Sequence, residues 1–393
     1  MLPPRLILAI ATAGAALLAA AQPSSSLSSP RPVTVAQWRG TVQGVGQDEA
    51  SIAWCDYAQV TIRRLAPAST RRLAGSCELG STLVVAGDRL AWHGYSDIRD
   101  NHTAWTLAGA ADGRVRRIDA ASEQFQPGVG DDIVGLVSDG ASLLYARLRS
   151  SVTIGDACVV SIRHKGGGIY RIGSQGTTRL SRLPAAVLIA AAGGRIAAIA
   201  PAREAQWRCT GETGLDYPRP EANAAVEVRR ANGNLLTRFR PTGIVRSLAL
   251  SSDYGVTLVE RAGRMRIDWY DAAAGSRLGS TSVPASATQL SAAGERAVFA
   301  TGKVIRLVDL RAGRQRVLWR STGDWEPIGL SIAGERVVWG EQRGHTARAR
   351  AQPGPLTLTS REATSPPRAR APSRRHAGGA RPSSACTAAW RLG

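Results

Sequence analysis

The sequence is poor in histidine and lacks the short motifs of the common catalytic sites. Its 393 residues include five histidines, and two of these, His345 and His376, lie near the C-terminus. We find no nucleophile elbow, zinc-protease helix, phosphate-binding loop or EF-hand loop. Because a serine-type triad needs a positioned histidine, the sequence disfavours hydrolysis of that kind.

Lysine is almost absent, although the chain is strongly basic. The formal net charge is +20, and the two lysines are Lys165 and Lys303. Residues 343–393 hold ten arginines and one acid, Glu362, and so contribute +9 of this charge. An arginine bias with much alanine and glycine is typical of a GC-rich genome, so it does not by itself indicate phosphate contacts. We expect no specific nucleic-acid partner, while an acidic partner such as an anionic envelope polymer remains an alternative.

One apolar run near the N-terminus is the sole segment of its kind. Arg5 precedes 16 apolar or small residues, from Leu6 to Ala21, and the run ends in small residues. It is shorter than the ~20 residues of a bilayer span and has the pattern of a secretory signal peptide. An uncleaved anchor is the alternative. We expect a signal peptide over 1–21, a linker over 22–32, a secreted, periplasmic or cell-envelope location, and no transmembrane span in the mature chain.

What the chain does contain is an apolar hairpin that recurs about every 40–60 residues. The first hairpins of six units lie at 84–92, 136–145, 191–197, 251–258, 293–298 and 333–338. A unit of this size cannot bury an apolar face alone, so neighbouring units must stack. The pattern predicts an all-β fold, a single β-propeller with one small sheet per repeat. Seven four-stranded blades fit the spacing best, with six or eight as alternatives.

The predicted blades begin near residues 41, 82, 133, 186, 245, 286 and 327. The last blade is incomplete, because after Arg350 the sequence turns to Pro, Ser, Ala and Arg with little alternation. We expect the segment Val33–Trp38 to supply its outer strand and so join the two ends of the ring. This places the propeller at 33–350 and a disordered tail at 351–393.

We name the strands of each blade A to D from the inside outward. The turns between strands C and D contain Gly113, Gly233, Gly275 and Gly313. A tight hairpin loop needs a positive φ at such a position. We therefore assign these glycines a backbone role and no catalytic one.

The hairpins resemble those of TolB-like, WD-repeat and quinoprotein-type propellers. The segment 308–319 is similar to a quinone-cofactor repeat, with Asp309 before the turn, Gly313 in it and Trp319 after it, and 269–275 is a shorter echo. The resemblance implies the propeller architecture over about residues 33–350. We expect no cofactor.

Five cysteines are present, Cys55, Cys77, Cys158, Cys209 and Cys386, and export permits disulfides. Strands B and D of a meander end at the same edge; Cys55 closes strand B of blade 1 and Cys77 follows its strand D. Cys158 and Cys209 both lie between strands B and C, in adjacent blades. We predict the pairs Cys55–Cys77 and Cys158–Cys209, with free buried thiols as the alternative. No pair has the short spacing of a zinc site.

The B–C connections tend to be longer in blades 1–4 than in blades 5–7. Long loops are predicted at 93–102, about 150–166 and 201–223, and the D–A connection 119–132 emerges on the same face. Binding residues often lie on loops held by a rigid scaffold. We predict a partner-binding surface here, with the alternative that the insertions only cover strand edges. The candidate residues are Tyr95, Asp97, Asp100, His102, Trp207, Asp216 and Tyr217.

The favoured hypothesis is an exported, monomeric, non-enzymatic scaffold that binds a protein or an anionic envelope polymer through the B–C face of blades 1–4. The alternative is an envelope-associated carbohydrate-active hydrolase or lyase. It would need paired carboxylates at the channel mouth, for which Asp97, Asp131 and Glu204 are available.

A cation site is a further alternative for the loop of blade 2. His93, Asp97, Asp100 and His102 place four ligand-type side chains within ten residues. Loop polarity explains them equally well, so we assign no metal and no catalytic residue.

Overall fold

The computed structural model describes residues 31–353 except 57, 76, 78–81, 100–101, 112, 125–127, 156–158, 175, 181 and 209–219. It describes the backbone alone for residues 94–99, 102–108, 110–111, 121–124, 128–131, 152, 154–155, 159–160 and 204–208. The predicted signal peptide, nearly all of the predicted linker and tail, and Cys386 lie outside these residues. The described residues belong to one compact unit, and no helix among them is long and apolar enough to cross a membrane.

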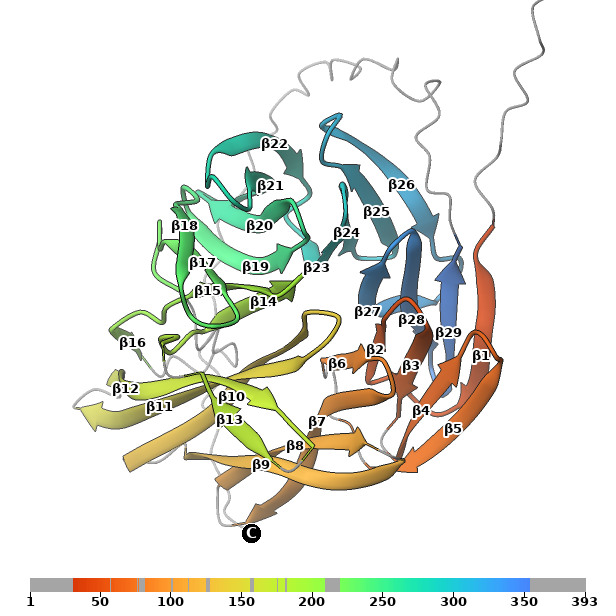
Figure 1. Cartoon of the computed structure of the whole chain (residues 1–393), viewed down its shortest axis with the longest axis horizontal. Helices are drawn as coiled ribbons and strands as arrows, with labels where there is room; N and C mark the ends of the chain where they lie inside the picture. The colour runs from red at the N-terminus through yellow and green to blue at the C-terminus, as the bar shows by residue number, and fades with distance from the viewer. Residues whose placement is uncertain are drawn as a thin grey trace, which may run out of the picture. The chain divides into compact units, whose positions relative to one another are not determined.

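The described strands form seven antiparallel sheets arranged in a ring (Figure 1). This confirms the all-β propeller. Blade 1 contains β2 (Gly44–Gln47), β3 (Ser51–Cys55), β4 (Gln59–Arg64) and β5 (Ser69–Ala74). Blade 2 contains β6 (Leu83–Ala86), β7 (Arg89–Arg99), β8 (His102–Ala111) and β9 (Arg114–Gln124). Blade 3 contains β10 (Gly128–Ser138), β11 (Leu143–Gly155), β12 (Val159–Ile172) and β13 (Thr177–Arg179).

The remaining blades follow in chain order. A further strand, β16 (Glu204–Arg208), lies in the sequence between the second and third strands of blade 4. Blade 4 contains β14 (Leu188–Ala192), β15 (Arg195–Ile199), β17 (Val226–Arg230) and β18 (Leu235–Phe239). Blade 5 contains β19 (Ile244–Leu250), β20 (Tyr254–Arg261), β21 (Arg264–Asp271) and β22 (Arg277–Val283). Blade 6 contains β23 (Ala287–Ala293), β24 (Arg296–Thr301), β25 (Val304–Asp309) and β26 (Arg314–Arg320). Blade 7 contains β27 (Glu326–Ala333), β28 (Arg336–Arg343), β29 (Thr346–Gln352) and β1 (Val33–Arg39).

Blade 7 is thus completed by the N-terminal strand, as the sequence predicted. β1 pairs with β29 from Val33 opposite Ala351 to Arg39 opposite Thr346. β29 runs to Gln352, two residues past the expected end of the propeller at Arg350. The first and last described strands therefore close the ring through backbone hydrogen bonds.

Each blade packs its two apolar faces against its neighbours. The cluster between blades 1 and 2 includes Val60, Leu83 and Trp92, and the cluster between blades 5 and 6 includes Trp269 and Phe299. Buried apolar area stabilises at roughly 25 cal/mol per Å². Because each blade takes part in two such interfaces, the stability of one blade depends on the next.

The turn glycines have the predicted backbone. The φ angles of Gly113, Gly233, Gly275 and Gly313 are +80°, +88°, +75° and +66°. Other residues are disfavoured in this region, so these glycines set the C–D turns of four blades.

Three predicted loops are instead mostly strand. The connection at 93–102 is the end of the β7–β8 hairpin, that at 150–166 is the end of the β11–β12 hairpin, and most of 119–132 belongs to β9 and β10. The polar sequence led to the wrong prediction, because pairing of backbone groups in a sheet does not itself require an alternation of apolar side chains. Backbone pairing alone satisfies the polar groups of the sheet backbone.

The long B–C connection of blade 4 contributes a strand to its neighbour. β16 pairs antiparallel with β12 from Arg208 opposite Val159 to Glu204 opposite Arg163. The connection therefore extends the sheet of blade 3 to five strands and ties blade 4 to blade 3.

An arginine at the start of strand B reaches the next blade in several places. Arg195 Nη1 donates to the carbonyl of Ser252 at 2.9 Å, and Arg296 Nη1 contacts Glu335 Oε1 at 2.8 Å. Arg336 makes the ring-closing contact, because it donates to Gln47 Oε1 at 2.7 Å and to the carbonyls of Asp48 and Glu49 in blade 1.

Replacing Arg336 should cost more stability than replacing its counterpart Arg296. Arg336→Met leaves Gln47 and two carbonyls without their donor, which costs about 2 kcal/mol. Arg296→Met removes a partly exposed ion pair worth about 0–1 kcal/mol. Urea unfolding of both variants measures the difference, and equal losses would contradict a special role for Arg336 in closing the ring.

A buried carboxylate joins blades 6 and 7. Glu341 on β28 has no exposed surface and accepts hydrogen bonds of 2.6 Å from Trp319 Nε1, Ser321 Oγ and Arg348 Nε. Burial raises the pKa of Glu341, but the hydrogen bonds from Ser321, Trp319 and Arg348 outweigh it and hold this pKa below its ordinary value. The folded state therefore favours the charged form.

Glu341→Gln should destabilise the protein by about 3 kcal/mol near pH 7, because it leaves the largely buried Arg348 without its counter-charge. A depressed folded-state pKa contributes stability above the unfolded-state value and loses it as the pH falls through the folded-state value. The difference in the free energy of unfolding between wild type and variant should therefore become smaller at acidic pH. Urea unfolding at neutral and acidic pH tests this, with exposed Glu326→Gln as the control, and a pH-independent gap would rule it out.

Candidate functional site

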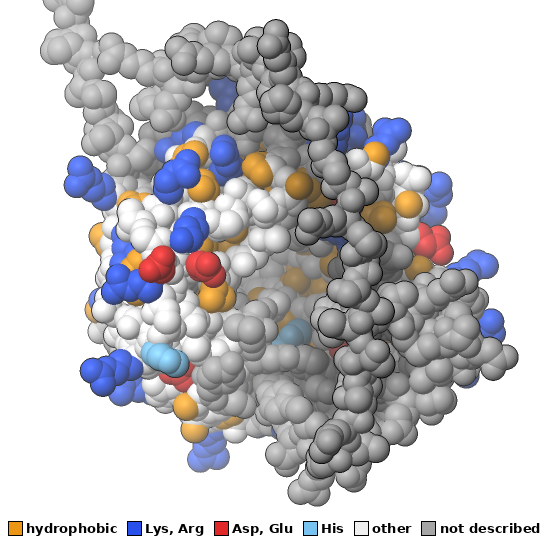
Figure 2. Space-filling model, turned by 180° about the vertical axis from the view of Figure 1, so that it is seen from behind, with side chains coloured by type: hydrophobic (Ala, Val, Ile, Leu, Met, Phe, Trp, Pro, Cys, Tyr) orange, Lys and Arg blue, Asp and Glu red, His pale blue; other side chains and the backbone are white. Residues whose placement is uncertain are grey.

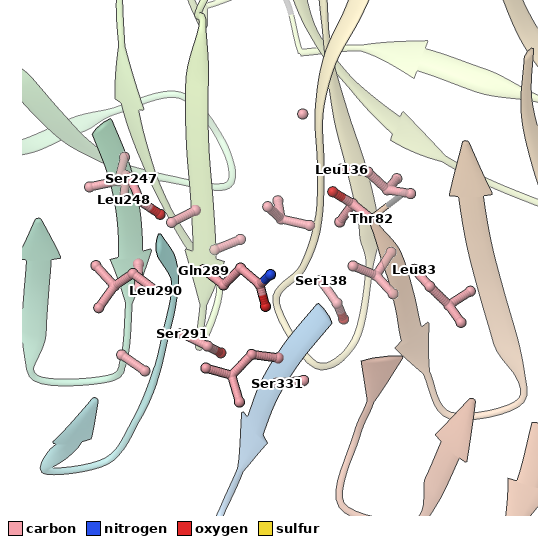
Figure 3. A pocket seen from close by; sticks show the side chains of 18 of the residues that line it. Thr82, Leu83, Leu136, Ser138, Ser247, Leu248, Gln289, Leu290, Ser291 and Ser331 are labelled. Carbon is pink, nitrogen blue, oxygen red and sulfur yellow. The ribbon is translucent and has the colours of Figure 1, made fainter. Parts of the chain in front are cut away.

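A channel runs through the centre of the ring between the seven A strands. Its volume is about 460 Å³. Figure 3 shows leucines and hydroxyl-bearing side chains around it, with the Gln289 carboxamide projecting inward. Among the described residues the lining holds no ionisable side chain. The polar side chains are Gln47, Thr82, Ser138, Ser247, Gln289, Ser291 and Ser331.

The acids suggested for a carbohydrate-active site do not come from this lining. Asp131 lies on β10 and Glu204 on β16, at opposite edges of the enlarged blade 3 sheet. With β11 and β12 between them, their backbones are about 14 Å apart at a spacing of ~4.8 Å per strand. Glycosidase carboxyl groups lie about 5–9.5 Å apart, so this backbone register does not favour Asp131 and Glu204 as a pair.

Four of the predicted partner-binding residues lie on described strands at one end of the ring. Tyr95 and Asp97 lie on β7, His102 starts β8, and Trp207 lies on β16. These four are described by their backbone alone. Asp100, Asp216 and Tyr217 lie outside the described residues. The backbone therefore places two hairpins and one added strand beside each other, and the side-chain contacts stay a prediction.

The cation site suggested for blade 2 has one fully described member, His93. Burial lowers the pKa of His93 to about 4, so the imidazole is neutral at pH 7. Within the part of the chain that the structure describes, no three His, Cys, Asp or Glu side chains gather as a metal site would require.

A cleft of about 620 Å³ opens between blades 3 and 4 at the same end of the ring. Arg163 and His164 line one side, and Pro201 and Arg203 line another. His164 Nδ1 lies 3.1 Å from the hydroxyl of the buried Ser150, and burial lowers the pKa of His164. The cleft thus places the side chains of Arg163 and Arg203 near the imidazole of His164, which is hydrogen-bonded to Ser150.

The charge is distributed unequally between the two faces of the ring. The B–C face is the end formed by the B–C and D–A turns, and the A–B face is the opposite end. In blades 5–7 the B–C face exposes seven cations and two acids, Asp324 and Glu326. The cations are Arg39, Arg240, Arg261, Arg264, Lys303, Arg320 and Arg343. Figure 2 shows blue side chains around one face of the molecule, with few red ones among them.

The A–B face of the same blades is nearly balanced. It exposes four cations, Arg31, Arg277, Arg311 and Arg314, and three acids, Asp253, Glu295 and Glu335. The arginine-rich composition accounts for the net charge of the chain but does not reveal this asymmetry. A count of charges turn by turn along the predicted blades would have found it.

The predicted disulfide of blade 1 is present. Cys55 at the end of β3 and Cys77 after β5 are bonded, with their Cα atoms 6.1 Å apart. The predicted partners Cys158 and Cys209 lie outside the described residues.

No protein-family model and no curated protein matches the chain. Among solved structures it is similar to BamB from Moraxella catarrhalis, at 10% identity over 79% of this chain and 85% of that chain, with a TM-score of 0.39. It is also similar to Sqt1 from Saccharomyces cerevisiae, at 12% identity over 82% and 99% of the two chains, with a TM-score of 0.45. A third is the β-propeller domain of the Trilobed protease from Pyrococcus furiosus, at 10% identity over 81% and 97%, with a TM-score of 0.46. These likenesses concern the fold alone.

Proposed function

We propose that the protein is an exported, non-enzymatic scaffold that holds a polyanionic partner, an acidic protein or an anionic envelope polymer, on its B–C face. The observation that carries this proposal is the charge asymmetry between the faces of blades 5–7. The B–C face exposes seven cations and two acids, whereas the A–B face exposes four cations and three acids. A uniform arginine bias would place similar numbers of cations on both faces.

The two halves of the B–C face have different parts in this proposal. The turns of blades 5–7 are short and present cations spread over three neighbouring blades. In blades 2–4 the β7–β8 hairpin extends the sheet of blade 2, and the β11–β12 hairpin with β16 extends the sheet of blade 3. These extended sheets supply the recognition surface predicted for blades 1–4, with Tyr95, Asp97 and Trp207 as candidates on their strands. Tyr217 is a further candidate from the sequence of the blade 4 connection.

Export is part of the same proposal. The apolar run from Leu6 to Ala21 has the pattern of a signal peptide. The Cys55–Cys77 bond suits an oxidising compartment such as the periplasm or the cell exterior.

The chain contains a matched pair of turns that tests the charged face. The sequence Arg-Ala-Gly-Arg occurs at 261–264 in the B–C turn of blade 5 and at 311–314 in the C–D turn of blade 6, on the opposite face, and all eight residues are exposed. Reversing both charges of the first turn (Arg261→Glu with Arg264→Glu) should weaken polyanion binding about tenfold or more at ~50 mM salt. The same reversal at Arg311 and Arg314 should change it less than about threefold.

Fluorescence anisotropy with labelled polygalacturonate and with labelled poly-L-glutamate measures both variants. Wild-type affinity should fall steeply between ~50 and ~200 mM salt, because binding releases counterions. Equal losses in the two variants would mean that net charge, and not this face, governs binding. Preference for one probe separates a polysaccharide-type partner from an acidic protein.

Aromatic residues of the blade 4 connection should add contact area to the charged face. Trp207→Ala and Tyr217→Ala should each weaken capture of the preferred probe by about 1 kcal/mol or more, as for aromatic residues at interfaces, and leave the salt dependence unchanged. The control is Tyr254→Ala, which lies at the start of β20, beside the A–B turn of blade 5 on the opposite face. Unchanged capture in both variants would remove blade 4 from the binding surface.

A further inference from the structure

Four A strands carry an extra residue that bulges near the B–C end of the channel. The register slips at Val134 in β10, Arg246 in β19 and Gly329 in β27. In β23 the slip lies between Thr288 and Ser291, at Gln289 and Leu290. The bulge is thus a repeated feature of the ring, and its residue type differs from blade to blade.

Gln289 adopts a backbone conformation that its side chain disfavours. Its φ angle is +56°, and the equivalent residue of the next blade, Gly329, has a φ of +68°. Glycine adopts this region without steric cost, whereas a residue with a Cβ atom is strained there. Such strain persists where the surrounding structure enforces it, and it is concentrated at binding and catalytic sites.

The strained residue directs a polar group into the channel. Figure 3 shows the Gln289 carboxamide at the centre of the view, with Ser138, Ser291 and Ser331 around it. A carboxamide and hydroxyls both donate and accept hydrogen bonds. The lining also includes partly exposed apolar side chains of the A strands, Leu188 and Leu330.

We propose that the channel binds a neutral, hydroxyl-rich ligand, a sugar unit of an uncharged glycan, with Gln289 as its principal hydrogen-bonding residue. The described lining offers no counter-charge, so an ionised ligand would lose its hydration without compensation. The donors and acceptors of Gln289 and the serines match sugar hydroxyls, and the partly exposed Leu188 and Leu330 match the C–H faces of a sugar ring. The volume of about 460 Å³ falls within the ~300–1,000 Å³ of small-molecule sites.

This inference is independent of the polyanion proposal, because it concerns the uncharged channel and not the charged turns. Isothermal titration calorimetry with maltose and with chitobiose tests it on the full-length protein. Wild type should bind at least one of these neutral disaccharides, and Gln289→Gly should weaken that binding about tenfold or more. Affinity for the charged disaccharide digalacturonate should be the same in both proteins.

A second measurement separates loss of the side chain from damage to the fold. Gln289→Gly relieves the strain and Gln289→Ala keeps it, so the glycine variant should unfold about 2 °C above the alanine variant. Both should bind the neutral disaccharide equally weakly, since neither has the carboxamide. Three results would each overturn the proposal. Wild type could bind neither neutral disaccharide, Gln289→Gly could bind as tightly as wild type, or the glycine variant could be no more stable than the alanine variant.

Discussion

Seven blades are stable here only as a closed ring, because each blade buries its two apolar faces against its neighbours. Closure is achieved twice in blade 7. β1 pairs with β29 through the backbone, and Arg336 reaches across to Gln47 and the carbonyls of blade 1. Glu341 adds a buried charged contact between blades 6 and 7. Because the ring is closed, each blade packs against a neighbouring blade on both sides.

A closed ring leaves the turns free to vary, since they contribute little to the interfaces between blades. The protein uses this freedom unequally. In blades 5–7 the turns are short and carry cations on the B–C face, while in blades 2 and 3 the B–C connections grow into long hairpins. The two surfaces that we propose to bind ligands have opposite chemistry. The outer B–C face is charged and salt-sensitive, and the channel is uncharged and suited to neutral hydroxyls.

The two proposals differ in how firmly the scaffold holds the residues involved. The cations of the B–C face lie in exposed turns, where long arginine side chains remain mobile and act through their summed field. Gln289 lies on an A strand packed between blades, at a bulge that fixes its direction. Electrostatic attraction over the broad B–C face and hydrogen bonding by Gln289 in the channel are therefore carried by separate parts of the molecule.

The sequence by itself determined the elements whose signal is local. Apolar alternation and turn glycines were enough to predict the blades, and the leftover segment at Val33–Trp38 was enough to predict the closing strand. The bond between Cys55 and Cys77 also followed from strand order alone. The tertiary structure decided what depends on pairing at a distance. The hairpins of blades 2 and 3 looked like loops because their sequences are polar, whereas pairing of backbone groups needs no apolar alternation. β16 joins blade 3 through backbone hydrogen bonds that its amino-acid composition does not indicate. The charge asymmetry and the strained backbone of Gln289 were likewise visible only in the tertiary structure. The ring sets the face on which each charged side chain lies and the φ angle of Gln289, and neighbouring residues in the chain do not.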